Sequence, residues 1–255
     1  MRHIEPGSVI LITGATGGIG SEIAAQAAES GAIVGVHGSR QETVDKTIAQ
    51  LSEATPSAKF IAVPGDLREP GVIDSIVNRV VGEAGKLDAV IHCAITGAPG
   101  TQGLFANMDP QAFGANAALV LGIFQQLCFA ALPHLSKQGG TIVGFASDAG
   151  RFASARQSVL GASFGGIMMF VRNLALEVAR SGVRIHCISP SYVVDTPVFE
   201  RYARGAGERG IRAQERAGLG LPSPKDIAPM ALFLCGPDAA KITGQIISIN
   251  GGLNA

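Results

Sequence analysis

The sequence has only four cysteines, and they do not show the spacing of a metal site. They stand at positions 93, 128, 187 and 235 without any CxxC pair, and most lie within apolar runs. A cysteine in such a setting behaves as a small buried hydrophobe, whereas metal sites are recognised from closely spaced ligand pairs. We therefore expect free thiols in a reducing compartment and no metal site.

The chain also lacks an excess of charge of either sign. It has 20 Lys and Arg residues against 20 Asp and Glu residues, and no basic cluster. This excludes the electrostatic footprint of a protein that binds nucleic acid or an anionic membrane, and favours small-molecule chemistry or protein contact. Segment 1–7 has no secretory apolar core, and no apolar run approaches membrane-spanning length. Together these absences predict a soluble, cytoplasmic protein.

What the chain does contain is a regular alternation of strand-like and helix-like segments. Its 255 residues suit a single domain over 1–255. Strands are expected at 9–12, 33–36, 60–63, 89–93, 141–145, 183–188 and 245–249, and helices at 21–28, 41–53, 70–84, 110–136, 158–181 and 225–236. This order predicts an α/β fold, a doubly wound parallel sheet of about seven strands with ligands at the carboxyl ends of the strands. The Gly- and Arg-rich stretch within 198–222 is interpreted as a mobile insertion that could form a substrate lid.

A glycine-rich turn follows the first expected strand. Residues 13–20 read TGATGGIG and lead into the helix-prone segment 21–28. The glycines permit a tight turn, close approach of a pyrophosphate to the backbone and close packing of helix on strand, while a helix N-terminus offers unpaired N–H groups. The turn predicts a phosphate site for a dinucleotide, and the alternative is a tight turn that serves only the fold.

With its other motifs, the chain resembles the short-chain dehydrogenase/reductase family over nearly its whole length. These motifs are TGATGGIG at 13–20, Gly65-Asp66-Leu67, Asn116, the run 139–143 leading to Ser147, Gly161-Ala162-Ser163, Ser189-Pro190, Asp195-Thr196-Pro197, and the terminal segments 242–245 and 250–252. The resemblance implies a Rossmann fold, NAD or NADP as cofactor, and oxidoreductase chemistry between an alcohol and a ketone.

The resemblance also assigns cofactor-binding residues one by one. They are Gly14, Thr16, Gly17, Gly18, Ile19 and Gly20 in the turn, Ser39 and Arg40 after the second strand, Asp66 and Leu67 after the third, Ala94 after the fourth, and Thr196 after the sixth. It implies that Asp66 lies by the adenine and that Thr196 approaches the nicotinamide amide. Gly38 stands where NAD enzymes of the family place an acidic residue, and Arg40 suits a 2′-phosphate, which favours NADP. A solvated surface role for Arg40 stays open.

Two residues of the family's proton relay are missing. In the family, a tyrosine acts as general acid or base, a lysine four residues later lowers its pKa, and a serine and an asparagine assist. The matching segment here has Leu160 at the tyrosine position and Phe164 at the lysine position, whereas Ser147 and Asn116 are retained. Because general acid–base catalysis is worth about 10²–10⁴ in rate, ordinary ketone reduction is expected to be very slow.

Other departures affect the same end of the site. The enoyl-reductase variant of the family places its tyrosine seven residues before the lysine, which puts Gln157 at the acid position and leaves Phe164 at the lysine position. Ile95 and Ser191 replace family glycines and are expected to crowd the nicotinamide. The adenine half of the site is therefore expected to be better preserved than the reactive half.

A relocated proton donor is the alternative to a lost one. The candidates near the strand ends and the serine loop are His92, Tyr192, Asp148, Arg151 and Arg156. The competing interpretations are a hydrogen-bonded histidine at a strand end, a packed loop aromatic, and solvated or ion-paired arginines. A donor that worked with Ser147 would permit an isomerisation, elimination or retro-aldol step as well as hydride transfer.

The long apolar segments 110–136 and 158–181 are expected to form an oligomer interface. The resemblance implies tetramers in which these two helices pack against the same helices of a neighbour. Intact helices beside an eroded site predict a non-catalytic subunit of a hetero-oligomeric NAD(P)-dependent hydroxyacyl or keto-compound dehydrogenase, paired with an active paralogue. The alternatives are an active oxidoreductase, lyase or isomerase with a relocated donor, and a dinucleotide-sensing regulator; a homotetramer is the other possible assembly.

Overall fold

A computed structural model describes residues 4–95, 97–200 and 207–254 of the chain. Its single sheet has the strand order β3-β2-β1-β4-β5-β6-β7, and all neighbouring strands run parallel. The strands are β1 (Val9–Thr13), β2 (Ile33–Val36), β3 (Lys59–Ala62), β4 (Ala89–His92), β5 (Gly140–Phe145), β6 (Val183–Pro190) and β7 (Ile246–Ile249). The seven-stranded doubly wound fold expected from the sequence is confirmed.

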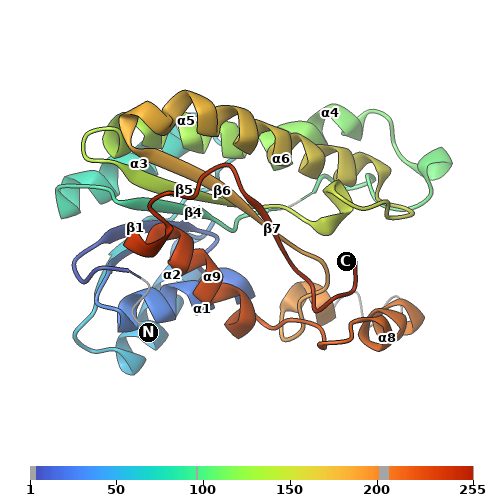
Figure 1. The fold of residues 1–255 in the computed structure, drawn as a ribbon, viewed down its shortest axis with the longest axis horizontal. Coiled ribbons are helices and arrows are strands. Elements are labelled where there is room, and N and C mark those ends of the chain that lie inside the picture. The colour runs from blue at the N-terminus through green and yellow to red at the C-terminus, as the bar shows by residue number, and fades with distance from the viewer. Residues whose placement is uncertain (1–3, 96, 201–206, 255) are drawn as a thin grey trace.

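Helices cover both faces of this sheet (Figure 1). They are α1 (Gly18–Glu29), α2 (Gln41–Ala54), α3 (Val72–Ala84), α4 (Ala112–Ala117), α5 (Ile123–Leu135), α6 (Ser158–Val178), α8 (Gly207–Arg216) and α9 (Pro224–Cys235). Helices α1, α2 and α9 lie on one face, and α3, α5 and α6 lie on the other. The helix expected at 110–136 is present as the continuous stretch Ala112–Leu135, whose middle turn, Ala118–Gly122 between α4 and α5, is π-helical. Such turns are rare and frequently lie at functional sites.

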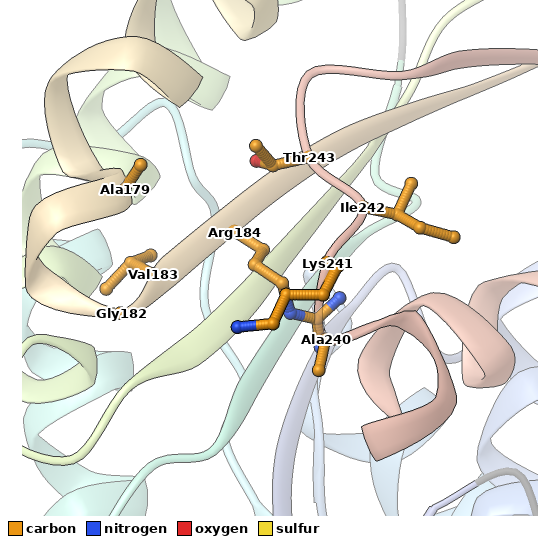
Figure 2. Close-up of a pocket in the computed structure, with 8 residues that line it drawn as sticks. All are labelled: Ala179, Gly182, Val183, Arg184, Ala240, Lys241, Ile242 and Thr243. Carbon is orange, nitrogen blue, oxygen red and sulfur yellow. The ribbon is translucent and has the colours of Figure 1, made fainter.

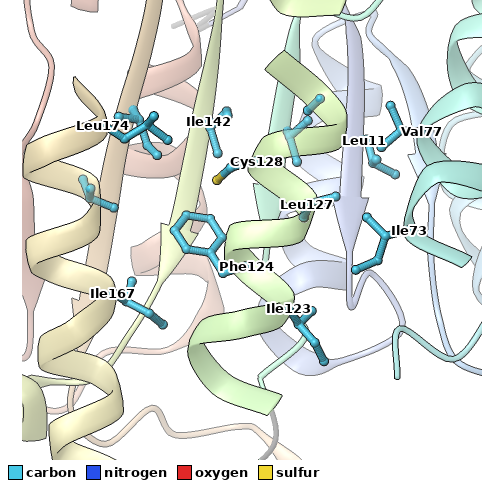
Figure 3. Packing of buried hydrophobic residues seen from close by; sticks show 14 of the residues in the cluster. Leu11, Ile73, Val77, Ile123, Phe124, Leu127, Cys128, Ile142, Ile167 and Leu174 are labelled. Carbon is cyan, nitrogen blue, oxygen red and sulfur yellow. The ribbon is translucent and has the colours of Figure 1, made fainter. Parts of the chain in front are cut away.

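Two helical stretches correct the expectation that no segment reaches membrane-spanning length. Ala112–Leu135 and Ser158–Ser181 are long and apolar enough to cross a membrane by length and composition. Their inner faces, however, pack on the sheet, where Phe124, Leu127 and Ile167 are completely buried (Figure 3). Such packing is typical of core helices in a soluble protein.

A hollow of about 230 Å³ lies near the amino end of β6, and Figure 2 shows the residues that line it. Arg184, which lines it, donates hydrogen bonds to the carbonyl oxygens of Leu234 at 2.5 Å and Gly236 at 3.2 Å. The guanidinium thus satisfies carbonyl groups at the C-terminal end of α9. Because the glycine-rich turn lies at the carboxyl ends of the strands, this hollow is separate from the candidate site.

The structure describes only part of segment 198–222, which the sequence analysis interpreted as a mobile insertion. Residues 201–206 lie outside the described residues, and residues 207–216 form α8. The Leu219 N–H donates to the Gly251 carbonyl at 3.0 Å, and Ala213 and Ala217 belong to a small apolar cluster with Leu253. The described part of this segment is therefore helical and joined to the C-terminal residues, and its role as a substrate lid stays a prediction.

Candidate dinucleotide site

The glycine-rich turn joins β1 to α1 at the carboxyl edge of the sheet. Gly14 has a φ of +75°, and a Cβ atom there would lie 2.7 Å from the backbone nitrogen of Ala94. A Cβ atom on Gly20 would lie only 2.2 Å from the carbonyl oxygen of Gly14. Helix α1 begins without a capping side chain, so the first N–H groups of the helix are available to an anion. The turn fits the pyrophosphate of a dinucleotide.

His37, a residue that the sequence analysis did not single out, holds this turn from the end of β2. Its Nδ1 accepts a hydrogen bond from the Gly14 N–H at 3.2 Å, and its Nε2 donates to the Gly65 carbonyl oxygen at 2.9 Å. Both bonds require the neutral ring with the proton on Nε2. Burial lowers the pKa of His37 and favours this form. The histidine thus links the ends of β1, β2 and β3.

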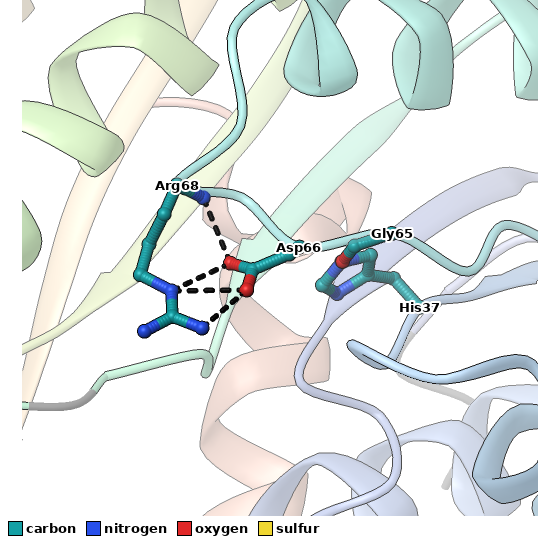
Figure 4. A network of polar contacts seen from close by, with 4 residues as sticks. All are labelled: His37, Gly65, Asp66 and Arg68. Carbon is teal, nitrogen blue, oxygen red and sulfur yellow. Dashed lines mark hydrogen bonds and ion pairs between the residues drawn. The ribbon is translucent and has the colours of Figure 1, made fainter.

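Asp66, expected beside the adenine, is paired with Arg68 (Figure 4). The Arg68 Nε lies 2.8 Å and 3.0 Å from the two carboxylate oxygens, and its backbone N–H donates to Oδ1 at 3.0 Å. Hydrogen bonds from the Arg68 side chain and backbone lower the pKa of Asp66 to about 2. The carboxylate is therefore ionised at neutral pH and able to accept a hydrogen bond from a ligand amine.

The end of β2 is shaped by contact between Gly38 and Thr16. A Cβ atom on Gly38 would lie 2.6 Å from the Thr16 methyl carbon and 2.8 Å from its hydroxyl oxygen. An acidic side chain at position 38 would consequently require Thr16 to move. Ser39 and Arg40 follow as exposed residues, and Arg40 precedes the first turn of α2.

The predicted nicotinamide end is bounded by Thr196. The Thr196 methyl group packs against Gly18, where an added Cβ atom would lie 2.9 Å away. Its hydroxyl donates to the Val193 carbonyl oxygen at 2.8 Å and accepts from the Phe199 N–H at 3.1 Å. The fold therefore brings Thr196 to the glycine turn, while its hydroxyl is engaged within its own loop; its expected approach to the nicotinamide amide stays a prediction.

Asn116, which the sequence analysis assigned to the proton relay by resemblance, is fully buried in a local network. Its Nδ2 donates to the Ser163 hydroxyl at 2.9 Å, and its Oδ1 accepts from the Ala98 N–H and the Thr101 hydroxyl, each at 3.1 Å. These bonds connect α4, the loop after β4 and α6. In this arrangement Asn116 ties three segments together.

Leu160 and Phe164 present apolar side chains next to this network. They are 7% and 6% exposed on α6 and belong to the main hydrophobic core cluster. A Cβ atom on Gly97 would lie 3.2 Å from both the Leu160 Cδ1 and the Asn116 Oδ1. Leu160 thus adjoins Asn116, and neither Leu160 nor Phe164 has a side chain that can hold a proton.

Ser147 lies at the end of β5, beside a buried carboxylate. Its hydroxyl oxygen accepts from the Ala149 N–H at 3.3 Å. The neighbouring Asp148 is 1% exposed and accepts hydrogen bonds from Ser189 at 2.8 Å, Ser248 at 2.7 Å and Asn250 at 2.6 Å. These partners occupy the ends of β6 and β7 and the following loop. Because three donors already satisfy the carboxylate, Asp148 serves as an anchor for the serine loop.

His92 is a packed strand-end histidine, the interpretation that competed with a proton donor. It is completely buried, stacks on Phe124 with ring centroids 5.4 Å apart, and forms a 2.7 Å hydrogen bond between Nδ1 and the Thr13 hydroxyl. Burial lowers its pKa to about 3, so the ring is neutral at physiological pH. Tyr192 likewise packs edge-on against Phe199 at 6.4 Å, which confirms the packed-aromatic interpretation.

The low pKa of His92 predicts acid sensitivity. Its pKa falls from 6.5 to about 3 on folding, so the unfolded chain binds the proton first, and the stabilising contribution present above pH 6.5 is lost as the pH falls. His92→Leu removes the group that takes up this proton on unfolding. Below pH 6, we therefore expect the unfolding free energy of the variant to change with pH less steeply than that of the wild type, by about 1.4 kcal/mol per pH unit. Urea unfolding at several pH values measures both slopes, and identical slopes would contradict the assignment.

Histidines and aspartates of this kind leave little trace in a sequence. The only signal for His37 is its place directly after a buried strand, and the sequence does not indicate which groups meet Asp148.

Arg151 and Arg156 are exposed, in agreement with their expected solvated role. Within the described ranges, no cluster of three His, Cys, Asp or Glu residues could hold a metal ion, and the four cysteines are free thiols.

Comparison with known proteins places this geometry in a family. Residues 14–254 match the family described as Enoyl-(Acyl carrier protein) reductase. The chain is 30% identical to D-beta-hydroxybutyrate dehydrogenase of Rhizobium meliloti, covering 96% of this chain and 98% of the relative, and 29% identical to 3-oxoacyl-(acyl-carrier-protein) reductase FabG of Chlamydia muridarum, covering 99% and 100%.

Solved structures share the fold. A short-chain type dehydrogenase/reductase from Mycobacterium ulcerans superposes with a TM-score of 0.91 at 23% identity, covering 98% of this chain and 90% of the other. A 7 alpha-hydroxysteroid dehydrogenase complexed with NADH and 7-oxo glycochenodeoxycholic acid gives 0.89 at 24% identity, covering 98% and 96%. From the family match over most of its length and the 30% identical relative, the chain belongs to the short-chain dehydrogenase/reductase family.

Proposed function

We propose that this chain is a non-catalytic, cytoplasmic subunit of a hetero-oligomeric NAD(P)-dependent dehydrogenase that acts on hydroxyacyl or keto compounds. The observation that supports it most directly is the apolar pair Leu160 and Phe164, buried on α6 at the two proton-handling positions. The relatives named for 3-oxoacyl and hydroxybutyrate chemistry support the substrate class.

Among the described residues, the substitute donors weighed from the sequence are engaged in other contacts. Asp148 accepts three hydrogen bonds, His92 is buried and neutral, and Tyr192 is packed against Phe199. An apolar surface in place of an ammonium group also disfavours the charge that develops during hydride transfer. These contacts support the interpretation that the proton donor has been lost over the interpretation that another residue has taken its place.

The cofactor half of the site is better preserved, and we propose that it binds NADP. Gly14, Gly20 and the uncapped start of α1 form a cradle for the pyrophosphate. Thr16 fills the space beside Gly38 that an acidic, NAD-selecting side chain would need, and Arg40 is exposed nearby for a 2′-phosphate. A bound nicotinamide cofactor would supply the hydride, and the residues of this chain would bind and orient it.

The assembly proposed here is a tetramer built through α4, α5 and α6. Large apolar side chains stand exposed on two of these helices: Phe129 on α5 is 80% exposed, and Leu176 on α6 is 82% exposed. Exposed apolar patches of this kind mark protein interfaces. An active relative of the same fold would present a similar helical face.

A second candidate function is an active NAD(P)H oxidoreductase with a rebuilt relay, because the relatives are named as reductases and dehydrogenases. Titration with NADPH and NADH, followed by turnover with ketones and acyl-CoA substrates, separates the two. We expect binding of NADPH without turnover by the chain alone, and turnover only with an active relative. Turnover by the chain alone would establish the second candidate, whereas failure of any active relative to associate would refute the subunit role.

Arg40→Ala is the matched variant for this titration. Removing a charge-assisted contact to the 2′-phosphate is expected to weaken NADPH binding roughly tenfold and to leave NADH binding unchanged. Equal affinities of the wild type for both cofactors would contradict the assignment of NADP.

A further inference from the structure

A groove of about 560 Å³ runs along the outer helical face between α3, α5 and α6. Apolar side chains line much of it, among them Phe129, Phe170 and Leu174. Glu69 and Asp74 enter the lining beside α3, and Glu177 enters it from α6. The groove therefore combines an apolar surface with three carboxylates.

None of these carboxylates belongs to an ion pair, although Arg68 lies next to Glu69 and feels its charge. The groove lining contains no lysine or arginine, and the ion pairs among the described residues join Arg68 to Asp66, Arg79 to Glu83, and Lys86 to Asp88. All three groove acids are exposed. Their charge is thus available to whatever covers the groove.

The rest of this helical face offers little positive charge in return. The stretch 112–135, which contains α4 and α5, has no Asp, Glu, Lys or Arg, and α6 adds Arg172 as its only basic residue. Counted over Glu69 and helices α3, α5 and α6, four acids (Glu69, Asp74, Glu83 and Glu177) stand against two arginines (Arg79 and Arg172), so each face has two more negative charges than positive ones. In a two-fold dimer of this chain, the same face of each copy contacts the other copy. The excess negative charge of one face would therefore lie close to that of the other.

We infer that this face selects a relative whose matching helices present lysine or arginine, and that it disfavours a second copy of this chain. The inference rests on the proposed subunit function and specifies the chemistry of the partner. Apolar contact favours association with either a basic relative or a second copy of this chain. The charges favour the basic relative, since opposed like charges in an interface are unfavourable. The partner therefore fits the apolar groove with a basic rim.

Neutralising the groove tests this directly. The triple variant Glu69→Gln, Asp74→Asn, Glu177→Gln is expected to self-associate about tenfold more tightly than the wild type in sedimentation velocity at low salt. The control Glu29→Gln, Glu42→Gln, Glu53→Gln makes the same change in net charge on α1 and α2, which lie on the opposite face of the sheet, and is expected to leave association unchanged. Glu42, like Asp74, lies in the first turn of its helix, so the helix-dipole effect is matched.

A charge-reversed copy then serves as a partner of known chemistry. A copy with Glu69→Lys, Asp74→Lys and Glu177→Lys is expected to form a mixed complex with the wild type that is about tenfold tighter than either self-complex and is weakened by salt. Circular dichroism confirms folding of each variant. A tight, salt-independent wild-type homo-oligomer that the neutral variant does not strengthen would overturn the inference. Turnover by the chain alone would refute the proposed function and leave this result intact, so the two failures are distinguishable.

Discussion

Replacing Leu160 with Tyr and Phe164 with Lys in one chain is expected to raise the rate of NADPH-dependent ketone reduction by about 10²-fold or more. The two positions are one turn apart on α6, so a tyrosine hydroxyl and an ammonium group can face the same cleft. Asn116 adjoins position 160, and Ser147 follows β5 at the same edge of the sheet. The readout is NADPH consumption with a panel of ketone and acyl-CoA substrates.

The control for this experiment exchanges the two apolar side chains. Leu160→Phe with Phe164→Leu keeps the site apolar and is expected to leave the rate at its basal level. Because position 164 is 6% exposed, the buried lysine is expected to lower stability, which thermal unfolding monitors. A folded double variant that binds NADPH and gains no activity would show that these two side chains are not what limits the reaction.

Phe124→Ala is expected to destabilise the protein by about 3–5 kcal/mol, because it opens a cavity in a fully packed region. Phe124 is completely buried between α5 and the sheet, stacks on His92 and meets Phe170 edge-on at 5.8 Å (Figure 3). Gly144 of β5 lies against the ring, since an added Cβ atom would come within 2.5 Å of it. Chemical denaturation of the purified variant measures the loss.

Phe129→Ala on the same helix provides the comparison. This side chain is 80% exposed, so its truncation is expected to change the unfolding free energy of the isolated chain by less than about 0.5 kcal/mol. A loss below about 1 kcal/mol for Phe124→Ala would mean that the surrounding core collapses into the space, contrary to the rigid packing described above.

The sheet could be predicted from the sequence because each strand is a short apolar run between turn or helix signals. The run Val9–Thr13 and the segment Ile33–Val36 illustrate this, since both are nearly continuous apolar stretches, as expected for strands covered on both faces. The glycine turn could be predicted for a similar reason, because its residues are contiguous and each has a local steric role.

The polar organisation of the site could not be predicted in this way. Asp148 meets partners that are 41, 100 and 102 residues away in the chain, and nothing local identifies them. The two bonds of His37 depend on the separation of three strand ends, and nothing in the apolar segment after Asn116 indicates that one turn of its helix is π-helical. Sequence patterns indicate where such residues stand but not how their hydrogen-bonding groups are shared.

The anchoring of Asp148 also bears on how the protein is made. A ribosome releases Asp148 about 100 residues before Ser248 and Asn250, so during elongation this carboxylate stays hydrated while the earlier strands assemble. Only when β7 joins the sheet edge does the loop with Ser147 acquire its final anchor. The loop with Ser147 therefore cannot reach its final anchored arrangement before the last strand and Asn250 have been synthesised.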